Sequence, residues 1–513
     1  MLVAGIDSST QSTKILLCEA EDGTVVGEAS APHPDGTECH PRYWWDALSA
    51  AGRDLLERAD AVAVAAQQHG MVVLDETGEV IRPAMLWNDV KSAPQAAELV
   101  TEFGGAAEWA RCTGSVPTMS FTVTKLRWLA EHEPEHAARV HRVLLPHDWL
   151  TWRLAGGGAG PSESPEPQGP PESRGSSKSR GSSESPEPTT DRGDASGTGY
   201  FDPAAGTWLP SYAERALGHP VSLPRVAAPS EIVGRTHWGA AIAPGTGDNM
   251  GAALGLGLGE GDMAVSIGTS GTAYAVTPKP SADESGAVAG FADATGRFLP
   301  LVATVNAARV LVVTARLLGT DPAGLSRLAL AATPGADGLT LLPYLDGERT
   351  PNRPDANGVL RGLTTSNATP ENLARAAIEA VLCSLADAID HVAAVTGTAP
   401  GRIVLIGGGA RSAAIRALAP GIFGVPVTVP EPAEYVALGA ARQAAWTLAG
   451  RGSVTAPAAP DWPTAASQTY EADPQSRVRE QYAALRDDAA AWQVLRGMMS
   501  ATGFFVCCLD RIE

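Results

Sequence analysis

The sequence has no run of about 18 apolar residues, so it offers no candidate for a transmembrane helix. An N-terminal basic segment followed by an apolar stretch is also missing, and we therefore expect no signal peptide. The six cysteines show neither metal-ligand nor disulfide-framework spacing, which fits a reducing cytoplasm. Basic residues are not in excess: the formal net charge is −19, which argues against a general binder of nucleic acid or of anionic membranes. We expect a soluble, cytoplasmic protein.

The chain is too long to fold around one hydrophobic core. Its 513 residues predict two domains, and a composition with 44% hydrophobic and 19% charged residues is ordinary for a globular protein. The acidic balance sets a condition on any nucleotide site. Phosphates that the overall field repels must be met locally by backbone N–H groups, a cation or a helix N-terminus.

Strand-like and helix-like patterns alternate along the chain. Short apolar runs predict strands at 3–6, 14–18, 61–65 and 71–74, and helical spacing predicts helices at 44–58 and 121–133. Alternation of this kind favours an α/β architecture.

One segment, residues 156–190, consists almost entirely of Gly, Ser, Pro, Glu, Arg and Lys, and it contains S-E-S-P-E-P twice. A segment of this composition buries too little apolar surface to offset its ordering entropy, so we expect a disordered insertion in a surface loop. A docking function for this insertion is the less favoured alternative.

Two distant segments share one plan. Residues 2–17 and 263–276 each read as an apolar strand, a turn of Gly, Ser and Thr, and a second apolar strand. Small residues let backbone N–H groups approach phosphate oxygens, so the pair suggests a duplicated domain with two phosphate loops. A third glycine-rich turn, I-V-L-I-G-G-G-A-R-S at 403–412, favours an adenosine contact. Taken singly, each loop also fits an ordinary turn.

These loops, in this order, resemble those of the FGGY family of carbohydrate kinases, and further motifs resemble its xylulokinase branch. The motifs are A-A-Q-Q-H-G-M at 65–71, R-P-A-M-L-W-N-D at 82–89, L-L-P-H-D-W-L at 144–150, D-R-G-D-A-S-G-T-G-Y-F-D at 191–202, G-D-N at 247–249, P-Y-L-D-G-E-R-T-P at 343–351 and I-G-G-G-A-R-S at 406–412. The likeness runs from Gly5 to about Ala445.

The resemblance implies an α/β fold of two duplicated actin-like, ribonuclease H-like domains with a cleft between them. We expect an N-terminal sugar-binding domain at 1–240, which carries the insertion, and a C-terminal nucleotide-binding domain at 241–450. Residues 451–513 would form a helical extension with an atypical tail. A homodimer is compatible with the resemblance.

The implied reaction is ATP-dependent phosphorylation of D-xylulose to D-xylulose 5-phosphate. Asp248 matches the catalytic base, which accepts the proton of the sugar's C5 hydroxyl. Because the reference pKa of an Asp is about 3.9, we expect this carboxylate to be ionised at neutral pH. It would then need no upward shift of its pKa to accept a proton.

The other site residues are carried over from the family in the same way. The sugar site comprises Gln68, His69, Asn88, Asp89, Asp248 and Asn249; the ATP site comprises Thr10, Ser12, Lys14, Thr269, Gly271, Gly408 and Gly409; and Asp7 would hold Mg²⁺, directly or through water. We interpret Trp87 as a core residue in preference to a sugar-stacking platform.

Some positions depart from the family pattern. Ser8 and Ser9 stand where many relatives have a glycine, Ala66 replaces another glycine, and His147 stands where relatives often carry Lys, which suggests a pH-dependent contact. The same chemistry on ribulose, gluconate or glycerol is an alternative, as is a non-catalytic sensor of sugar and nucleotide. Intact Asp7 and Asp248 argue against the sensor.

Overall fold

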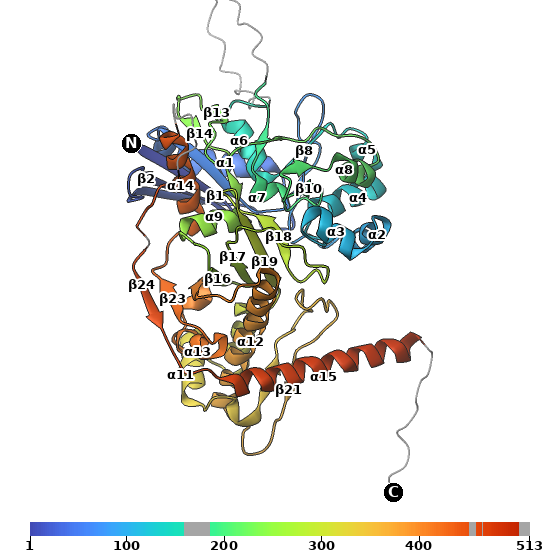
Figure 1. Ribbon diagram of the computed structural model, residues 1–513, viewed down its shortest axis with the longest axis vertical. Helices are drawn as coiled ribbons and strands as arrows, with labels where there is room; N and C mark the ends of the chain where they lie inside the picture. Colours follow the sequence, from blue (N-terminus) through green and yellow to red (C-terminus); the bar gives the residue numbers. More distant parts are fainter. Residues whose placement is uncertain (159–184, 451–457, 464, 502–513) are drawn as a thin grey trace, which may run out of the picture. The chain divides into compact units, whose positions relative to one another are not determined.

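The computed structural model of the chain describes residues 1–158, 185–450, 458–463 and 465–501, with side chains to residue 489 (Figure 1). Most of the predicted insertion at 156–190 and of the tail after 497 lies outside the described residues. Within the described part, no helix is both long enough and apolar enough to cross a membrane.

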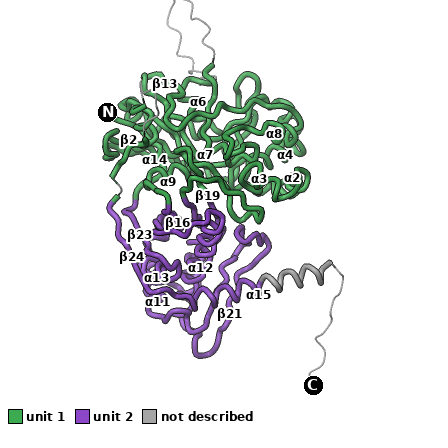
Figure 2. The backbone as a smooth tube through the Cα atoms, in the orientation of Figure 1, with its two compact units in different colours: residues 1–260, 276–300, 433–465 green, residues 261–275, 301–432, 466–513 purple. Residues whose placement is uncertain are grey.

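The chain forms two compact units, and each of them is discontinuous in sequence (Figure 2). Unit 1 comprises Met1–Glu260, Val276–Pro300 and Ala433–Ala465, and unit 2 comprises Gly261–Ala275, Leu301–Pro432 and Ala466–Glu513. These units therefore do not coincide with the expected domains at 1–240 and 241–450, because segments from beyond residue 260 return to unit 1.

The strands of unit 1 are β1 (Leu2–Ser8), β2 (Ser12–Glu19), β3 (Val25–Pro32), β4 (Glu38–Cys39), β5 (Ala61–Ala66), β6 (Val72–Leu74), β7 (Ala84–Met85), β8 (Arg142–Leu144), β9 (Thr189–Thr190), β10 (Phe201–Asp202), β11 (Thr207–Trp208), β12 (Arg225–Val226), β13 (Gly234–Arg235), β14 (Ala241–Ile242), β15 (Thr246–Gly247) and β18 (Ala289–Ala292). Its helices are α1 (Pro41–Leu56), α2 (Ala93–Glu102), α3 (Ala106–Thr113), α4 (Thr122–His132), α5 (Pro134–Ala137), α6 (Pro146–Leu154), α7 (Arg192–Ala195), α8 (Pro210–Leu217), α9 (Asp248–Gly255) and α14 (Tyr435–Ala449).

Unit 2 contains β16 (Asp262–Ile267), β17 (Gly271–Ala275), most of β19 (Phe298–Thr304), β20 (Thr340–Leu342), β21 (Val359–Arg361), β22 (Arg402–Ile406), β23 (Val427–Pro430) and β24 (Ser467–Tyr470). Its helices are α10 (Ala308–Leu317), α11 (Pro322–Ala331), α12 (Pro370–Thr396), α13 (Ala413–Phe423), α15 (Ser476–Ala501) and the short 3₁₀ turns η1 (Ala336–Gly338) and η2 (Gly408–Arg411). The strands and helices predicted from the sequence are confirmed, with ends displaced by up to a few residues.

The sequence repeat is a structural repeat. In unit 1, β1 pairs antiparallel with β2 and parallel with β5. In unit 2, β16 pairs antiparallel with β17 and parallel with β22. The main sheet of unit 1 has the order β13-β14-β5-β1-β2-β3, and within unit 2 the order is β19-β17-β16-β22-β23-β24. Each unit thus places one hairpin turn with Ser and Thr residues beside the end of a parallel strand.

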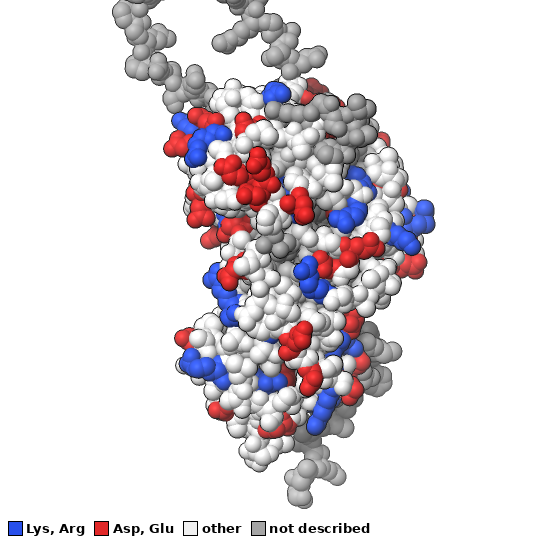
Figure 3. All heavy atoms as spheres, turned by 60° about the vertical axis from the view of Figure 1, so that its left-hand side comes forward, with Lys and Arg blue, Asp and Glu red and all other residues white. Residues whose placement is uncertain are grey.

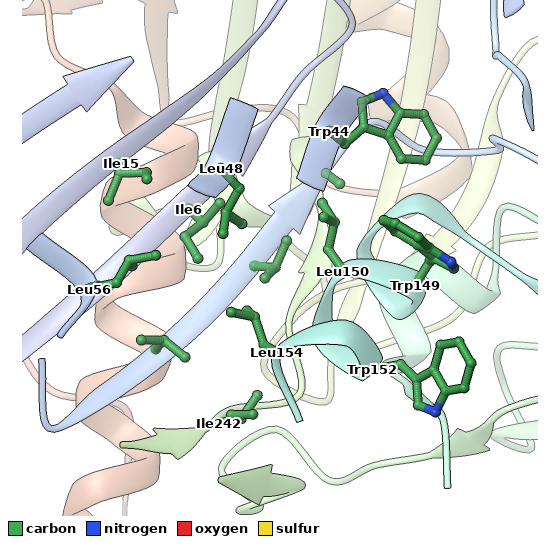
Figure 4. Close-up of a cluster of buried hydrophobic side chains, with 14 of the residues drawn as sticks. Ile6, Ile15, Trp44, Leu48, Leu56, Trp149, Leu150, Trp152, Leu154 and Ile242 are labelled. Carbon is green, nitrogen blue, oxygen red and sulfur yellow. The ribbon is translucent and has the colours of Figure 1, made fainter. Parts of the chain in front are cut away.

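Strand β5 separates two different cores of unit 1. Val62 and Val64 point to a core of large side chains from α1 and α6, which includes Trp44 and Trp149 (Figure 4). Ala61, Ala63 and Ala65 point to the opposite core, where they meet the alanines of α14. Alternate residues of a strand face opposite sides of its sheet. In the A-V-A-V-A-A sequence of β5, the valines therefore face the core of large side chains, and the alanines at 61, 63 and 65 face the closely packed helix α14.

Helix α14 lies so close to its neighbours that glycine is required at the contacts. A Cβ atom on Gly5 of β1 would lie 1.9 Å from the Ala437 carbonyl oxygen, and a Cβ on Gly439 would lie 1.8 Å from the Gly251 carbonyl oxygen of α9. A Cβ on Gly255 of α9 would lie 2.1 Å from the Tyr435 carbonyl oxygen. Because backbone atoms cannot move aside as a flexible side chain can, these glycines set the positions of β1 and α9 against α14.

This packing predicts that Gly439→Ala destabilises the protein by about 3 kcal/mol, since the added methyl group must displace backbone. Urea denaturation would measure the loss. The matched control is Gly450→Ala at the end of the same helix, where the nearest atoms would lie at 3.6 Å; we expect it to stay within about 0.5 kcal/mol of the wild type. Equal losses in the two variants would contradict this account.

Candidate active site

The candidate active site of unit 1 forms where two parallel strands end. Strand β15 pairs with the end of β5, so that Gly247 lies opposite Ala66. Gln68 follows β5, while Asp248 follows β15 directly and is the first residue of α9. The Nδ2 of Asn249 donates to the Gln68 Oε1 at 3.0 Å and to the Asp248 Oδ1 at 2.9 Å. Two sequence motifs far apart in the chain thus meet at the carboxyl ends of adjacent strands, where ligands of open α/β sheets bind.

The glycines before Asp248 are required by this geometry. Gly245 has φ +81°, and a Cβ there would lie 2.5 Å from the Val64 carbonyl oxygen. A Cβ on Gly247 would lie 2.8 Å from the Gln68 Cγ. The G-T-G-D-N segment therefore approaches β5 more closely than side chains would allow.

The pKa of the Asp248 carboxylate is higher than the sequence-based expectation. Part of the residue remains accessible to solvent, but the carboxylate is deeply surrounded, and burial raises its pKa to about 7. The charges of Asp7 and Asp194 raise this pKa further. The expectation that its pKa needs no upward shift is wrong, because sequence does not reveal which acidic neighbours surround a carboxylate or how much water is excluded.

Asp7 lies near the end of β1 and is itself buried. Burial raises its pKa to about 6, although the Ser9 Oγ donates to its Oδ1 at 2.5 Å. Lys14, expected at the phosphates, forms an ion pair with Glu434 at 2.6 Å, and both side chains are partly exposed. The site is thus rich in carboxylates, as is the whole chain with its net charge of −19. The face drawn in Figure 3 carries both acidic and basic side chains, and several acidic groups gather on its upper part.

The first hairpin turn is braced from within unit 1. The residue that braces it is His33, which was not predicted from the sequence. Each ring nitrogen of His33 has one hydrogen-bond partner: Nδ1 lies 3.0 Å from the Ser9 carbonyl oxygen, and Nε2 lies 2.9 Å from the Thr13 Oγ1. A carbonyl only accepts, so Nδ1 carries the proton and the Thr13 hydroxyl donates to Nε2 in the neutral ring. Burial lowers the pKa of His33, which favours this neutral form. Ser12 begins β2 beyond this turn.

Thr10 connects the hairpin turn to two other motifs. Its Oγ1 donates to the Gln67 Oε1 at 3.1 Å and accepts from the Trp87 Nε1 at 2.9 Å. Trp87 is 37% exposed, so its interpretation as a core residue is wrong. The hydrogen bond of its indole explains why it lies over the turn and outside the core.

His69 is held in an uncommon backbone conformation. It has φ +67°, its Nδ1 donates to the Gly197 carbonyl oxygen at 2.6 Å, and its ring packs against Phe121 and Phe291 at centroid distances of 4.9 and 5.7 Å. Because a carbonyl oxygen only accepts, Nδ1 carries a proton in this bond. A non-glycine residue at positive φ is a feature that clusters at functional sites.

The W-N-D motif supplies two different side chains. The Oδ1 of Asn88 is buried, and it has no hydrogen-bond partner among the described residues, as would suit an atom that binds a ligand. Asp89 already accepts from the Thr37 Oγ1 at 3.1 Å and the Lys91 backbone N–H at 2.9 Å, and it lies 3.4 Å from the Lys91 Nζ. A contact of Asp89 with sugar stays a prediction.

In unit 2 the two remaining loops lie against one strand end. The turn between β16 and β17 contains Thr269, and a Cβ on Gly271 would lie 2.8 Å from the Thr304 Oγ1. A Cβ on Gly409 of the third loop would lie 2.3 Å from the Ile267 Cγ2, whereas a Cβ on Gly408 would meet no atom within 4 Å. Gly408 thus borders open space beside the end of β16.

Four further residues around Asp248 were not assigned to the site from the sequence. The Thr246 Oγ1 donates to the Asp191 Oδ2 at 2.7 Å, and the His147 Nδ1 lies 2.6 Å from the Asp194 Oδ2. The motif at 191–202 was a signal for the two aspartates, but nothing in the sequence indicated that His147 and Thr246 would meet them.

Comparison with known proteins gives consistent results over nearly the whole chain. Residues 2–257 match the N-terminal domain of the FGGY family of carbohydrate kinases, and residues 263–448 match its C-terminal domain. A xylulose kinase of Streptomyces coelicolor is 46% identical over 490 residues, 92% of each chain, and one of Streptomyces rubiginosus is 45% identical over 95% of this chain and 96% of its own. The crystal structure of xylulose kinase from Bifidobacterium adolescentis superposes with a TM-score of 0.84 at 42% identity, covering 95% of this chain and 99% of that chain.

The raised pKa of Asp248 predicts a pH-dependent gain in stability for Asp248→Asn. Between the reference pKa of 3.8 and about 7, the unfolded chain has lost this proton while the folded chain retains it, so wild-type stability falls as pH rises. We expect equal stability of the two proteins below about pH 4 and a more stable variant at pH 8, by on the order of 3 kcal/mol.

Thermal unfolding midpoints of wild type and variant from pH 4 to 8 would measure this difference. The exposed Asp35→Asn removes the same charge from the surface and serves as the control. A destabilised Asp248→Asn at pH 8, or a difference independent of pH, would contradict the assignment.

Proposed function

Because this chain belongs to the FGGY family of carbohydrate kinases, we propose that it transfers the γ-phosphoryl group of ATP to the C5 hydroxyl of D-xylulose. The sugar is taken from relatives that are xylulose kinases and 45–46% identical over almost their entire length. The observation that carries the proposal is the placement of Asp248 and Asn249 beside Gln68 at adjoining strand ends.

Asp248 is proposed as the general base. A base is most effective when its pKa lies near the working pH, and burial with two acidic neighbours raises this pKa to about 7. Its Oδ1 already accepts from Asn249, both from the backbone N–H at 2.7 Å and from the Nδ2. The second carboxylate oxygen would therefore accept the proton of the C5 hydroxyl as that oxygen attacks phosphorus in line.

Two polar groups would orient the sugar beside this base. His69, whose Nδ1 donates to the Gly197 carbonyl, would present its ring to the sugar. The buried Asn88 Oδ1, which has no partner among the described residues, would accept from a sugar hydroxyl. Both groups are held by unit 1 itself, and such preorganisation limits the entropy lost on binding.

The phosphates of ATP are proposed to lie on the hairpin turns at Thr10 and Ser12, and at Thr269 and Gly271. Backbone N–H groups of such turns bind anions in a protein whose overall field repels them. Lys14 is close to the first turn and would have to leave Glu434 to reach a phosphate. Gly408 and Gly409 would border the adenosine.

Mg²⁺ fits this site as a companion of ATP. The described residues contain no cluster of three or more His, Cys, Asp or Glu side chains able to hold a metal alone, whereas Mg²⁺ commonly takes one or two carboxylates plus phosphate oxygens and water. Asp7 would hold it, since a cation would offset the burial that raises the pKa of Asp7. When bound, Mg²⁺ neutralises charge on the transferring phosphoryl group.

The compartment and the assembly are finer proposals. Four cysteines in the described part are free thiols, and those at 18, 39 and 383 are buried, which fits the reducing cytoplasm expected above. A homodimer stays a prediction.

The test is ADP release with MgATP and D-xylulose, compared with D-ribulose, L-ribulose, gluconate and glycerol, for wild type and Asp248→Asn. We expect turnover on D-xylulose at least about 100-fold above the variant, with ATP binding retained by both. Turnover on a different sugar would keep the mechanism and replace the substrate. Nucleotide binding without turnover on any sugar would favour a sensor instead.

A further inference from the structure

Behind the loop that carries Asp248 lies a buried cluster of one histidine and three aspartates. His147 and Asp148 begin helix α6, and Asp191 and Asp194 flank the start of α7. Their side chains are at most 5% exposed. The His147 Nδ1 lies 2.6 Å from Asp194, and its Nε2 lies 3.3 Å from Asp148 and 4.0 Å from Asp191. The mechanism proposed above uses these four residues only through the charge of Asp194, which helps to raise the pKa of Asp248.

Two of the aspartates have structural partners of their own. Asp148 accepts from the Leu145 backbone N–H at 2.8 Å. Asp191 caps α7 by accepting from the backbone N–H groups of Gly193 and Asp194 at 2.9 and 2.8 Å. Asp194 differs, because the one hydrogen bond to its Oδ2 in the described part of the chain comes from His147; its Oδ1, like that of Asp148, has no partner there. A buried carboxylate in that position requires a counter-charge.

His147 supplies that counter-charge. Burial alone lowers its pKa, but the charges of Asp148 and Asp194, with the hydrogen bond to Asp194, outweigh burial and raise the pKa to about 9. Among the described residues it is the one basic side chain within ion-pair distance of the three aspartates. Two other titratable groups face the cluster: Tyr200, whose pKa is raised by burial and by Asp148 and Asp194, and Asp248.

The cluster contacts the candidate active site on two sides. A Cβ on Gly245 would lie 2.7 Å from the His147 Cδ2, so the loop leading to Asp248 rests on the imidazole ring. Thr246, in the same loop, donates to Asp191. On the other side, Gly197, which lies just beyond α7, accepts from His69. Asp194 is also close enough to Asp248 for its charge to raise that pKa.

We propose that His147 is a positioning residue for phosphoryl transfer, whose buried positive charge holds Asp194 and whose ring supports the loop that carries Asp248. It would act through Gly245, Thr246 and the segment that ends at Gly197 and not through a contact with the sugar or ATP. The role rests on the proposed function, since it presupposes that Asp248 is the base.

Charge and shape can be separated by substitution. His147→Gln keeps a polar side chain but removes the positive charge, whereas His147→Lys keeps the charge and loses the ring. Without the positive charge of His147, the negative charges near Asp248 are no longer offset, so the pKa of Asp248 rises. The acidic limb of the pH profile of kcat/KM then moves to higher pH. We expect His147→Gln to lose about 10- to 100-fold in kcat with this displaced limb, and His147→Lys to keep the wild-type limb and more of the activity.

A third variant tests the same electrostatics in the opposite direction. Asp194→Asn removes one of the charges that raise the pKa of Asp248, and it keeps the shape of the side chain. We therefore expect its acidic limb at lower pH than in wild type. The Asp194→Asn variant still tests the proposed role if His147→Gln fails to fold, and the circular dichroism spectrum of His147→Gln would show whether it folds.

The experiment is the pH dependence of kcat/KM on D-xylulose for wild type and the three variants. Opposite displacements in His147→Gln and Asp194→Asn, with the limb restored in His147→Lys, support the role. An active wild type whose acidic limb moves in none of the variants would overturn the role of His147 and leave the proposed function intact. A wild type inactive on every sugar would overturn the proposed function, and this role with it.

Discussion

The close approach of helix α14 to β1 and α9 is the constraint on which the candidate active site depends. Gly5, Gly255 and Gly439 allow main-chain atoms to touch where any side chain would collide. Asp7 lies two residues beyond Gly5 on β1, and Asp248 begins the helix that contains Gly255. The two carboxylates proposed to act on MgATP and sugar are therefore fixed by contacts with one helix. Packing of this kind is rigid, because backbone atoms have no alternative rotamers.

The site concentrates negative charge where the reaction itself brings more. Burial raises the pKa of Asp7, Asp194 and Asp248 in the free protein, and each raised pKa marks a carboxylate that folding has deprived of water. Such desolvation disfavours the ionised form in the absence of a ligand. These buried carboxylates therefore reduce the stability of the free protein, although the proposed binding of cation and substrate requires them. Such a trade-off between stability and activity is common at active sites.

Sequence reasoning recovered the features that depend on local pattern. The paired hairpins, the strand before Gln68 and the position of Asp248 after a glycine-rich turn were all predictable, because each rests on residues adjacent in sequence. The features that it missed arise between distant segments: the raised pKa of Asp248, the exposed Trp87 bonded to Thr10, and the meeting of His147 with Asp194. A further example is the discontinuous division into units, which requires knowing that residues 433–465 return to pack on β1.

The insertion point has a consequence for chain connectivity. Helix α6, which carries His147, precedes residues 159–184, and β9 and Asp191 follow them. The Trp152 indole donates to the Pro186 carbonyl, so the two sides already meet without the intervening residues. A backbone break between 158 and 185 would divide the buried charge cluster between two polypeptides. The first fragment would keep His147 with Asp148 but lose Asp191 and Asp194 to the second. The two fragments would therefore act as halves of a split enzyme whose reassociation restores the ion pair of His147 with Asp194.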